Sequence, residues 1–162
     1  MGRALLLIVC SVGVASETFP ELSKQAASAR ARNQVDEAIR LYRECVRMRP
    51  SWSEGWWYLG TLLYDKDSFG DAGETLARFV KLEPDAAPGW ALLGLSEYET
   101  QKYADALTHL ERSLALGLKG DPQVSKVARF HSALLLTHFG QFEKALQRYA
   151  QLSVQGGDDP VR

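Results

Sequence analysis

Apolar residues recur along most of the chain at intervals of three and four positions, the spacing that places side chains on one face of an α-helix. The stretch from Val35 to Met48 shows this plainly, because Ala38, Tyr42 and Val46 form one apolar stripe among charged neighbours. We therefore predict an all-α chain built from pairs of helices. Four of these helices are predicted over residues 20–31, 35–48, 122–139 and 142–154.

A shorter motif, an apolar residue followed three positions later by alanine, returns at a nearly fixed interval. It occurs as Val35/Ala38, Phe69/Ala72, Tyr103/Ala106 and Phe142/Ala145. The successive alanines are 34, 34 and 39 residues apart. Self-similarity at a period of this size is typical of stacked repeat proteins. We predict four repeats, with five extra residues between the third and the fourth.

The second repeat carries a longer motif, most of which recurs in the third. In the second repeat it consists of Trp56, Leu59, Gly60, Tyr64, Phe69, Ala72, Leu76 and Pro84. In the third it consists of Trp90, Leu93, Gly94, Tyr98, Tyr103, Ala106 and Leu110. The period, the Trp-x-x-Leu-Gly start, the mid-repeat alanine and the late proline resemble the tetratricopeptide repeat, a helix–turn–helix unit. This resemblance implies a right-handed α-solenoid of four repeats, at about 19–52, 53–86, 87–120 and 122–155.

Two glycines of the motif fall inside predicted helices, where glycine costs roughly 1 kcal/mol relative to alanine. Such a cost makes sense if the missing side chain lets the second helix of the pair come close. We expect Gly60 to contact Ala72 and Gly94 to contact Ala106 in this way. The two motif tryptophans are then predicted to fill the space between neighbouring repeats.

The first residues differ in kind from the repeats. Met1-Gly2-Arg3 supplies one positive charge, residues 4–14 are apolar or small, and Val14-Ala15-Ser16 provides small residues for a cleavage site. This three-part pattern predicts a secretory signal peptide over 1–16 and a protein that is exported to the periplasm or beyond the cell. The apolar run is shorter than the roughly 20 residues of a membrane-spanning helix. A lipid anchor on Cys10 is the less favoured alternative, because Val9 before it is bulky for that type of cleavage.

The composition argues against some classes of partner, and the number of cysteines argues against an internal disulfide. The 162 residues carry a net charge of -1, with 24% charged and 46% hydrophobic residues, as in an ordinary soluble protein. No basic excess points to nucleic acid or to an anionic membrane surface. Once the signal is removed Cys45 remains alone, so we expect a small packing residue rather than a disulfide partner.

We find no constellation of residues that predicts catalysis, a metal or a cofactor. Asp65-x-Asp67 resembles the start of a calcium loop, but Leu76 stands where the loop requires a glutamate, and we expect a turn between helices. His131 and His138 lie about 10.5 Å apart along one predicted helix, too far to share a zinc ion. The sequence therefore favours a protein without enzymatic activity.

The family resemblance implies that the first helix of each pair lines a concave surface that often binds peptides. The candidate groove residues are Glu54, Trp57, Thr61, Tyr64, Asp65, Tyr98, Glu99 and Phe130. Further groove positions of the family correspond to Ala91, Leu95, Val127, Leu134, Thr137 and His138. This aromatic and acidic surface predicts a protein or peptide partner with basic and apolar residues. Family members that clamp a terminal carboxylate use Lys, Arg and Asn at positions held here by Ser23, Ala27, Tyr58 and Leu92, so that ligand is not expected.

Two hypotheses for the function stay open. The first is an exported, non-enzymatic interaction scaffold that binds a peptide or a partner helix in the groove. The second is an N-terminal positioning module, joined through a flexible tail or linker at 156–162 to an enzymatic or anchoring domain after residue 162. No polar capping helix follows the last repeat. We therefore expect either more protein after Arg162 or a docking or homodimer surface around Leu146, Tyr149 and Leu152.

Overall fold

The computed structural model describes residues 18–118 and 120–155, and in these residues it contains helices and no strands. The predicted signal peptide at 1–16, Cys10 within it, and the predicted tail at 156–162 lie outside the described residues. The helices are α1 (Phe19–Ala31), α2 (Val35–Met48), α3 (Ser53–Asp65), α4 (Phe69–Leu82), α5 (Ala87–Glu99), α6 (Tyr103–Leu116), α7 (Pro122–His138) and α8 (Phe142–Gln155).

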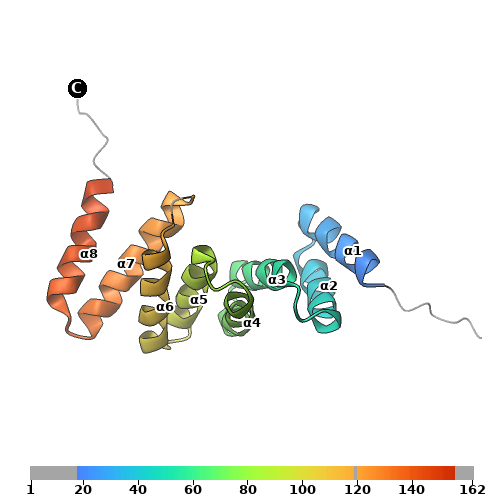
Figure 1. Cartoon of the computed structure of the whole chain (residues 1–162), viewed down its shortest axis with the longest axis horizontal. Coiled ribbons are helices and arrows are strands. Elements are labelled where there is room, and N and C mark those ends of the chain that lie inside the picture. Colours follow the sequence, from blue (N-terminus) through green and yellow to red (C-terminus); the bar gives the residue numbers. More distant parts are fainter. Residues whose placement is uncertain (1–17, 119, 156–162) are drawn as a thin grey trace, which may run out of the picture.

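The helices form antiparallel pairs that stack in chain order, from α1 at one end of the molecule to α8 at the other (Figure 1). Each pair packs on the next, and α5 also contacts α3 and α7, the first helices of its neighbours. The protein is therefore an all-α solenoid of four helix pairs, which confirms the fold class predicted from the period. The bounds of α2, and the longer first helix of the fourth pair, also agree with the sequence prediction.

The period is visible in the backbone of the turns as well. One residue in the turn inside each pair has a left-handed backbone. These residues are Asn33 (φ 57°), Asp67 (φ 58°), Gln101 (φ 61°) and Gly140 (φ 70°). They follow the spacing of the repeat alanines, so all four turns reverse the chain in the same way. Asp67 thus lies in the predicted turn between α3 and α4.

Close packing within each pair depends on alanine and glycine. The repeat alanines Ala38, Ala72 and Ala106 are fully buried. A methyl group added at Gly94 would lie 2.8 Å from Leu110 Cγ and 3.1 Å from the carbonyl oxygen of Ala106. The predicted close approach is therefore confirmed there.

At Gly60 the nearest side chain is Leu76, just as Leu110 is nearest at Gly94. A methyl group at Gly60 would lie 2.8 Å from both Cγ and Cδ2 of Leu76. Leu76 lies one helical turn beyond Ala72 on α4, and its larger side chain fills the space that the glycine leaves. The close approach of α3 and α4 is therefore confirmed, and a leucine makes the shortest contact.

The motif tryptophans connect each pair to the one before it. The indole N–H of Trp56 donates to the carbonyl oxygen of Pro50 at 2.8 Å, and that of Trp90 donates to Pro84 in the same way at 2.8 Å. Both rings are half-buried. Trp and Pro of the motif therefore act together, because the proline ends one pair and its carbonyl accepts a bond from the next.

A polar group holds the last pair in place. Glu111 on α6 accepts hydrogen bonds from the hydroxyl of Ser132 on α7 and from the guanidinium of Arg148 on α8, with Nε at 3.2 Å. Burial alone would raise the pKa of Glu111, but the bonds from Arg148 and Ser132 outweigh burial and lower it. The carboxylate is therefore held in its charged form where three helices meet.

Candidate functional site

The predicted groove residues all keep part of their side chains exposed, and they lie along α3, α5 and α7. Seven of them fall into three groups, while Thr61 on α3 donates its hydroxyl to the carbonyl oxygen of Tyr58 at 3.0 Å. Two further family positions do not line a surface: Ala91 is 0% and Leu95 is 5% exposed, so both are packing residues. The expectation that these two face a ligand is not supported by their burial.

The first group forms a pocket at the end of the helix pairs where α4 leads into α5. We call it the Trp57 pocket, and its volume is about 320 Å³. Its lining consists of Ser53, Glu54, Trp57, Phe79, Glu83, Ala86, Pro88 and Gly89. Three helices and one connection contribute to it, so the second and third repeats build it together. The volume is at the lower end of the range for ligand pockets, enough for one large side chain.

Two aromatic rings form the walls of the Trp57 pocket. The rings of Trp57 and Phe79 lie 5.1 Å apart between centroids, tilted by 42°. Phe79 is only 8% exposed, and its Cε1 lies 2.5 Å from the place where a side chain on Gly89 would begin. The wall is therefore fixed by packing, and the glycine makes room for it.

Both charged residues of the Trp57 pocket are acidic. Glu54 on α3 and Glu83 at the end of α4 are exposed, while Trp57 is half-buried. Glu54 and Trp57 are among the groove positions that the family resemblance implies. Phe79 and Glu83 were not predicted, because the family's groove positions lie on first helices.

The second group surrounds the hydroxyl of Tyr64 near the end of α3. The ring of Tyr64 packs edge-on against Phe69, with centroids 5.3 Å apart. Burial raises the pKa of Tyr64, and the negative charges of Glu99, Asp65 and Asp67 raise it further. Carboxylates from α3, from its turn and from α5 therefore converge here and make this end of the surface acidic.

The third group joins the third and fourth pairs through aromatic contacts. The ring of Tyr98 lies edge-on to His131, with centroids 4.8 Å apart, and 5.7 Å from Tyr103. Phe130, which is 45% exposed, also packs edge-on against His131, with centroids 5.5 Å apart. His131 Nδ1 donates to the carbonyl oxygen of Val127 at 2.9 Å, which fixes the ring. Tyr98 on α5 and Phe130 on α7 therefore meet at the same histidine, and neither lines the Trp57 pocket.

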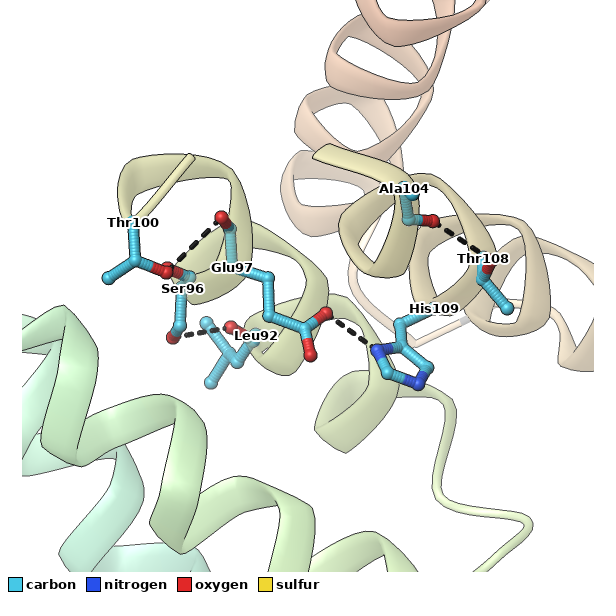
Figure 2. Close-up of polar contacts among 7 residues, drawn as sticks. All are labelled: Leu92, Ser96, Glu97, Thr100, Ala104, Thr108 and His109. Atoms are coloured by element: carbon cyan, nitrogen blue, oxygen red, sulfur yellow. Dashed lines mark hydrogen bonds and ion pairs between the residues drawn. The ribbon is translucent and has the colours of Figure 1, made fainter. Parts of the chain in front are cut away.

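One polar pair in the third repeat was not predicted. Glu97 on α5 and His109 on α6 point toward each other, with Oε2 and Nδ1 2.6 Å apart (Figure 2). The nearby hydroxyls of Ser96, Thr100 and Thr108 each bond to a carbonyl oxygen of their own helix (Figure 2). This group holds no hydroxyl aligned with the histidine, so the pair connects two helices rather than activating a nucleophile.

A second hollow lies on the opposite row of helices, between α2 and α4. We call it the outer cleft; it consists of two adjoining cavities of about 740 and 570 Å³ that share Arg43 and Arg47. Its charged lining residues are Asp36, Arg40, Arg43, Glu44, Arg47, Lys66, Asp71, Glu74, Arg78 and Lys81. Cations outnumber carboxylates in this cleft, in contrast to the Trp57 pocket.

Two features are absent from residues 18–118 and 120–155, a membrane-spanning helix and a metal-binding cluster. In this part of the chain no helix is both long and apolar enough to cross a membrane. The same residues contain no group of three His, Cys, Asp or Glu side chains arranged to hold a metal ion. Cys45 is buried, and its burial raises the pKa of the thiol, as expected of a packing residue.

Comparisons with known proteins agree with the helix-pair geometry. The sequence profile described as tetratricopeptide repeat matches residues 23–89 and 91–160. The chain is similar to a crystal structure of the MamA protein, with a TM-score of 0.75 and 24% identity over 86% of this chain and 74% of that chain. A second crystal structure of MamA gives a TM-score of 0.72 and 25% identity, over 82% and 75% of the two chains.

A third similar structure is that of YrrB, described as a TPR protein with an unusual peptide-binding site. Its TM-score is 0.71 at 17% identity, over 86% of this chain and 75% of that chain. A comparison with curated protein sequences gave no match. At these identities the structural similarity establishes the fold alone. The sequence profile adds independent support, because it matches most of the chain.

Proposed function

We propose, from the premise that this chain belongs to the tetratricopeptide repeat family, that it is a non-enzymatic scaffold that holds a peptide or a partner helix against its first helices. The observation that carries the proposal is the Trp57 pocket, an apolar hollow with acidic residues at its rim. A protein of this family that binds a peptide is among the similar structures, since YrrB is described as having a peptide-binding site.

The partner that fits best has apolar and basic residues. An apolar side chain would be buried against Trp57 and Phe79, and aromatic anchors of this kind supply much of the energy of protein recognition. Lysine or arginine side chains would pair with Glu54 at one end of α3 and with Asp65 and Glu99 at the other. Glu54 and Asp65 are about 16 Å apart along the helix, which about five residues of extended peptide can span.

The test is a selection of displayed random peptides on the purified protein, followed by anisotropy titrations of the selected peptides. We expect peptides enriched in Lys, Arg and apolar residues. Trp57→Ala should weaken their binding by about tenfold or more, or about 1.4 kcal/mol. Phe142→Ala is the matched control, because Phe142 is an aromatic residue on α8 that is 62% exposed and far from the pocket.

Two results would contradict the proposal. One is an unchanged dissociation constant for Trp57→Ala when circular dichroism shows the variant to be folded. The other is selection of acidic peptides whose binding depends on Arg78 or Lys81, which would move the binding site to the outer cleft.

We also propose that the protein acts outside the cytoplasm after removal of residues 1–16. The support is the sequence pattern alone, one arginine followed by a short apolar run and small residues at 14–16. N-terminal sequencing of the protein recovered from producing cells should begin at Glu17. A mature protein that still begins at Met1 would overturn this proposal.

A further inference from the structure

We infer that the Trp57 pocket receives an aromatic side chain from a partner segment that carries arginine or lysine beside it; this inference rests on the proposed function. The argument comes from the preceding repeat, where the chain has its own tryptophan 34 residues before Ala86. The residues 34 positions before the pocket lining are Phe19, Pro20, Ser23, Cys45, Arg49, Trp52, Glu54 and Gly55. Trp52 stands at the position that Ala86 holds in the pocket.

The backbone presents these two residues in the same way. Trp52 (φ −83°, ψ 91°) and Ala86 (φ −78°, ψ 86°) each immediately precede the first residue of a first helix. The N–H of Trp52 donates to the carbonyl oxygen of Arg49 at 3.0 Å, and that of Ala86 donates to Glu83 at 3.1 Å. The two junctions therefore differ in the side chain and not in the course of the chain.

At the first junction the indole of Trp52 is packed on several sides. Its ring lies edge-on to Phe19 at 5.1 Å and stacks on Tyr42 at 6.0 Å between centroids. Its Cε3 atom lies 2.2 Å from the place where a side chain on Gly55 would begin. At the second junction Ala86 supplies only a methyl group, and the pocket of about 320 Å³ remains open. Phe79 covers Gly89 at the second junction as Trp52 covers Gly55 at the first, so the part of the space that stays open lies beside Ala86.

The charge of the surrounding wall changes between the two copies. At the first junction the guanidinium of Arg49 lies 3.8 Å above the ring centroid of Phe19. The residues 34 positions after Arg49 and Pro20 are Glu83 and Glu54, so the second copy has two exposed carboxylates. A partner segment with an aromatic residue next to Arg or Lys would place a cation beside a ring here, as Arg49 and Phe19 do at the first junction. The same cation would pair with the carboxylates of Glu54 and Glu83.

The test uses the selected peptides with the variant Ala86→Trp, which supplies the missing indole from the chain itself. We expect selected peptides that contain an aromatic residue beside Arg or Lys, and binding weakened at least about tenfold in the variant because its pocket is already occupied. Gly120→Trp is the control, since Gly120 lies 34 residues after Ala86, near the start of α7, and an added side chain there meets no atom within 4 Å.

A second variant keeps the test independent of how the new tryptophan packs. Glu83→Arg gives the pocket wall the charge found at the first junction, and Glu83 is exposed, so the fold is preserved. We expect weaker binding of the basic peptides and a loss of the preference for Arg and Lys. Glu143→Arg makes the same charge change on α8, at an exposed residue away from the pocket, and should leave binding unchanged.

The outcomes separate this inference from the proposed function. Peptides that lose binding in Trp57→Ala but bind Ala86→Trp as tightly as the unmodified protein would overturn the aromatic insertion and leave the scaffold function intact. Selected peptides without aromatic residues would do the same. Peptides indifferent to Trp57→Ala, or a library that yields no binder, would count against both.

Discussion

The first two junctions between helix pairs, α2 to α3 and α4 to α5, achieve the same packing with large and small residues exchanged. At the first junction Trp52 on the connection is large and Cys45 on α2 is small and fully buried. At the second, Ala86 on the connection is small and Phe79 on α4 is large. Each large ring covers the corresponding glycine of the next helix, so one space is filled from two different elements.

The two junctions also differ in how closely the first helices approach and in whether a pocket is present. No Cα atom of α1 lies within 8 Å of a Cα atom of α3, whereas α3 and α5 do approach this closely. The ring of Trp52 contacts Phe19 on α1 and covers Gly55 on α3, so it lies between these two first helices. The ring of Phe79 comes from α4 and is 8% exposed, and the Trp57 pocket lies beside it. Moving one ring between two positions in the repeat is thus enough to accompany the gain or loss of a pocket.

The largest expected effect is the loss of the ring that fills the first junction. Trp52→Ala removes contacts with Phe19 and Tyr42, and we expect it to lower the free energy of unfolding by about 2–4 kcal/mol. Because each repeat contacts only its neighbours, the loss should concentrate in α1 and α2. Urea unfolding followed by circular dichroism gives the magnitude, and hydrogen exchange along α1 gives the location.

The control for this prediction is an aromatic residue that fills no junction. Phe142→Ala on α8 should change the stability by less than about 0.5 kcal/mol, because its ring is 62% exposed. A similar loss for both variants, or faster exchange spread evenly over the four pairs, would show that Trp52 does not hold the first junction in particular.

Most of the fold could be predicted from the sequence because the period constrains every repeat at once. Alanines at a fixed interval marked the buried contacts, and asparagine and glycine in the turns match the left-handed backbone that the structure shows at Asn33 and Gly140. The pattern gives the helix face but not which residue on that face comes nearest, and at both Gly60 and Gly94 the nearest side chain is a leucine.

Less of the candidate site could be predicted. Glu54 and Trp57 follow from the groove positions that the family resemblance implies, but Phe79 joins them only when a second helix is packed against the first. The pocket is open at Ala86 because alanine lacks the large side chain that Trp52 has. A small residue of this kind is not part of any sequence motif, so the pattern does not reveal it. Aligning the connections of the first two repeats is the comparison of sequences that would have shown it.

A smaller effect tests whether the two rings have equivalent roles. Gly55→Ala would place a methyl group 2.2 Å from Trp52, and Gly89→Ala would place one 2.5 Å from Phe79. Overpacking costs about 1–3 kcal/mol, against a gain of up to about 1 kcal/mol from helix propensity, so each variant should lose about 1–2 kcal/mol. In the Trp52→Ala background the clash at Gly55 is absent, and Gly55→Ala should become neutral or stabilising.

Gly89→Ala is the control and should cost the same in both backgrounds, because the ring that covers Gly89 belongs to Phe79. Urea unfolding of the single and double variants measures the coupling, and equal costs of Gly55→Ala with and without Trp52 would contradict the assignment of that space to the indole.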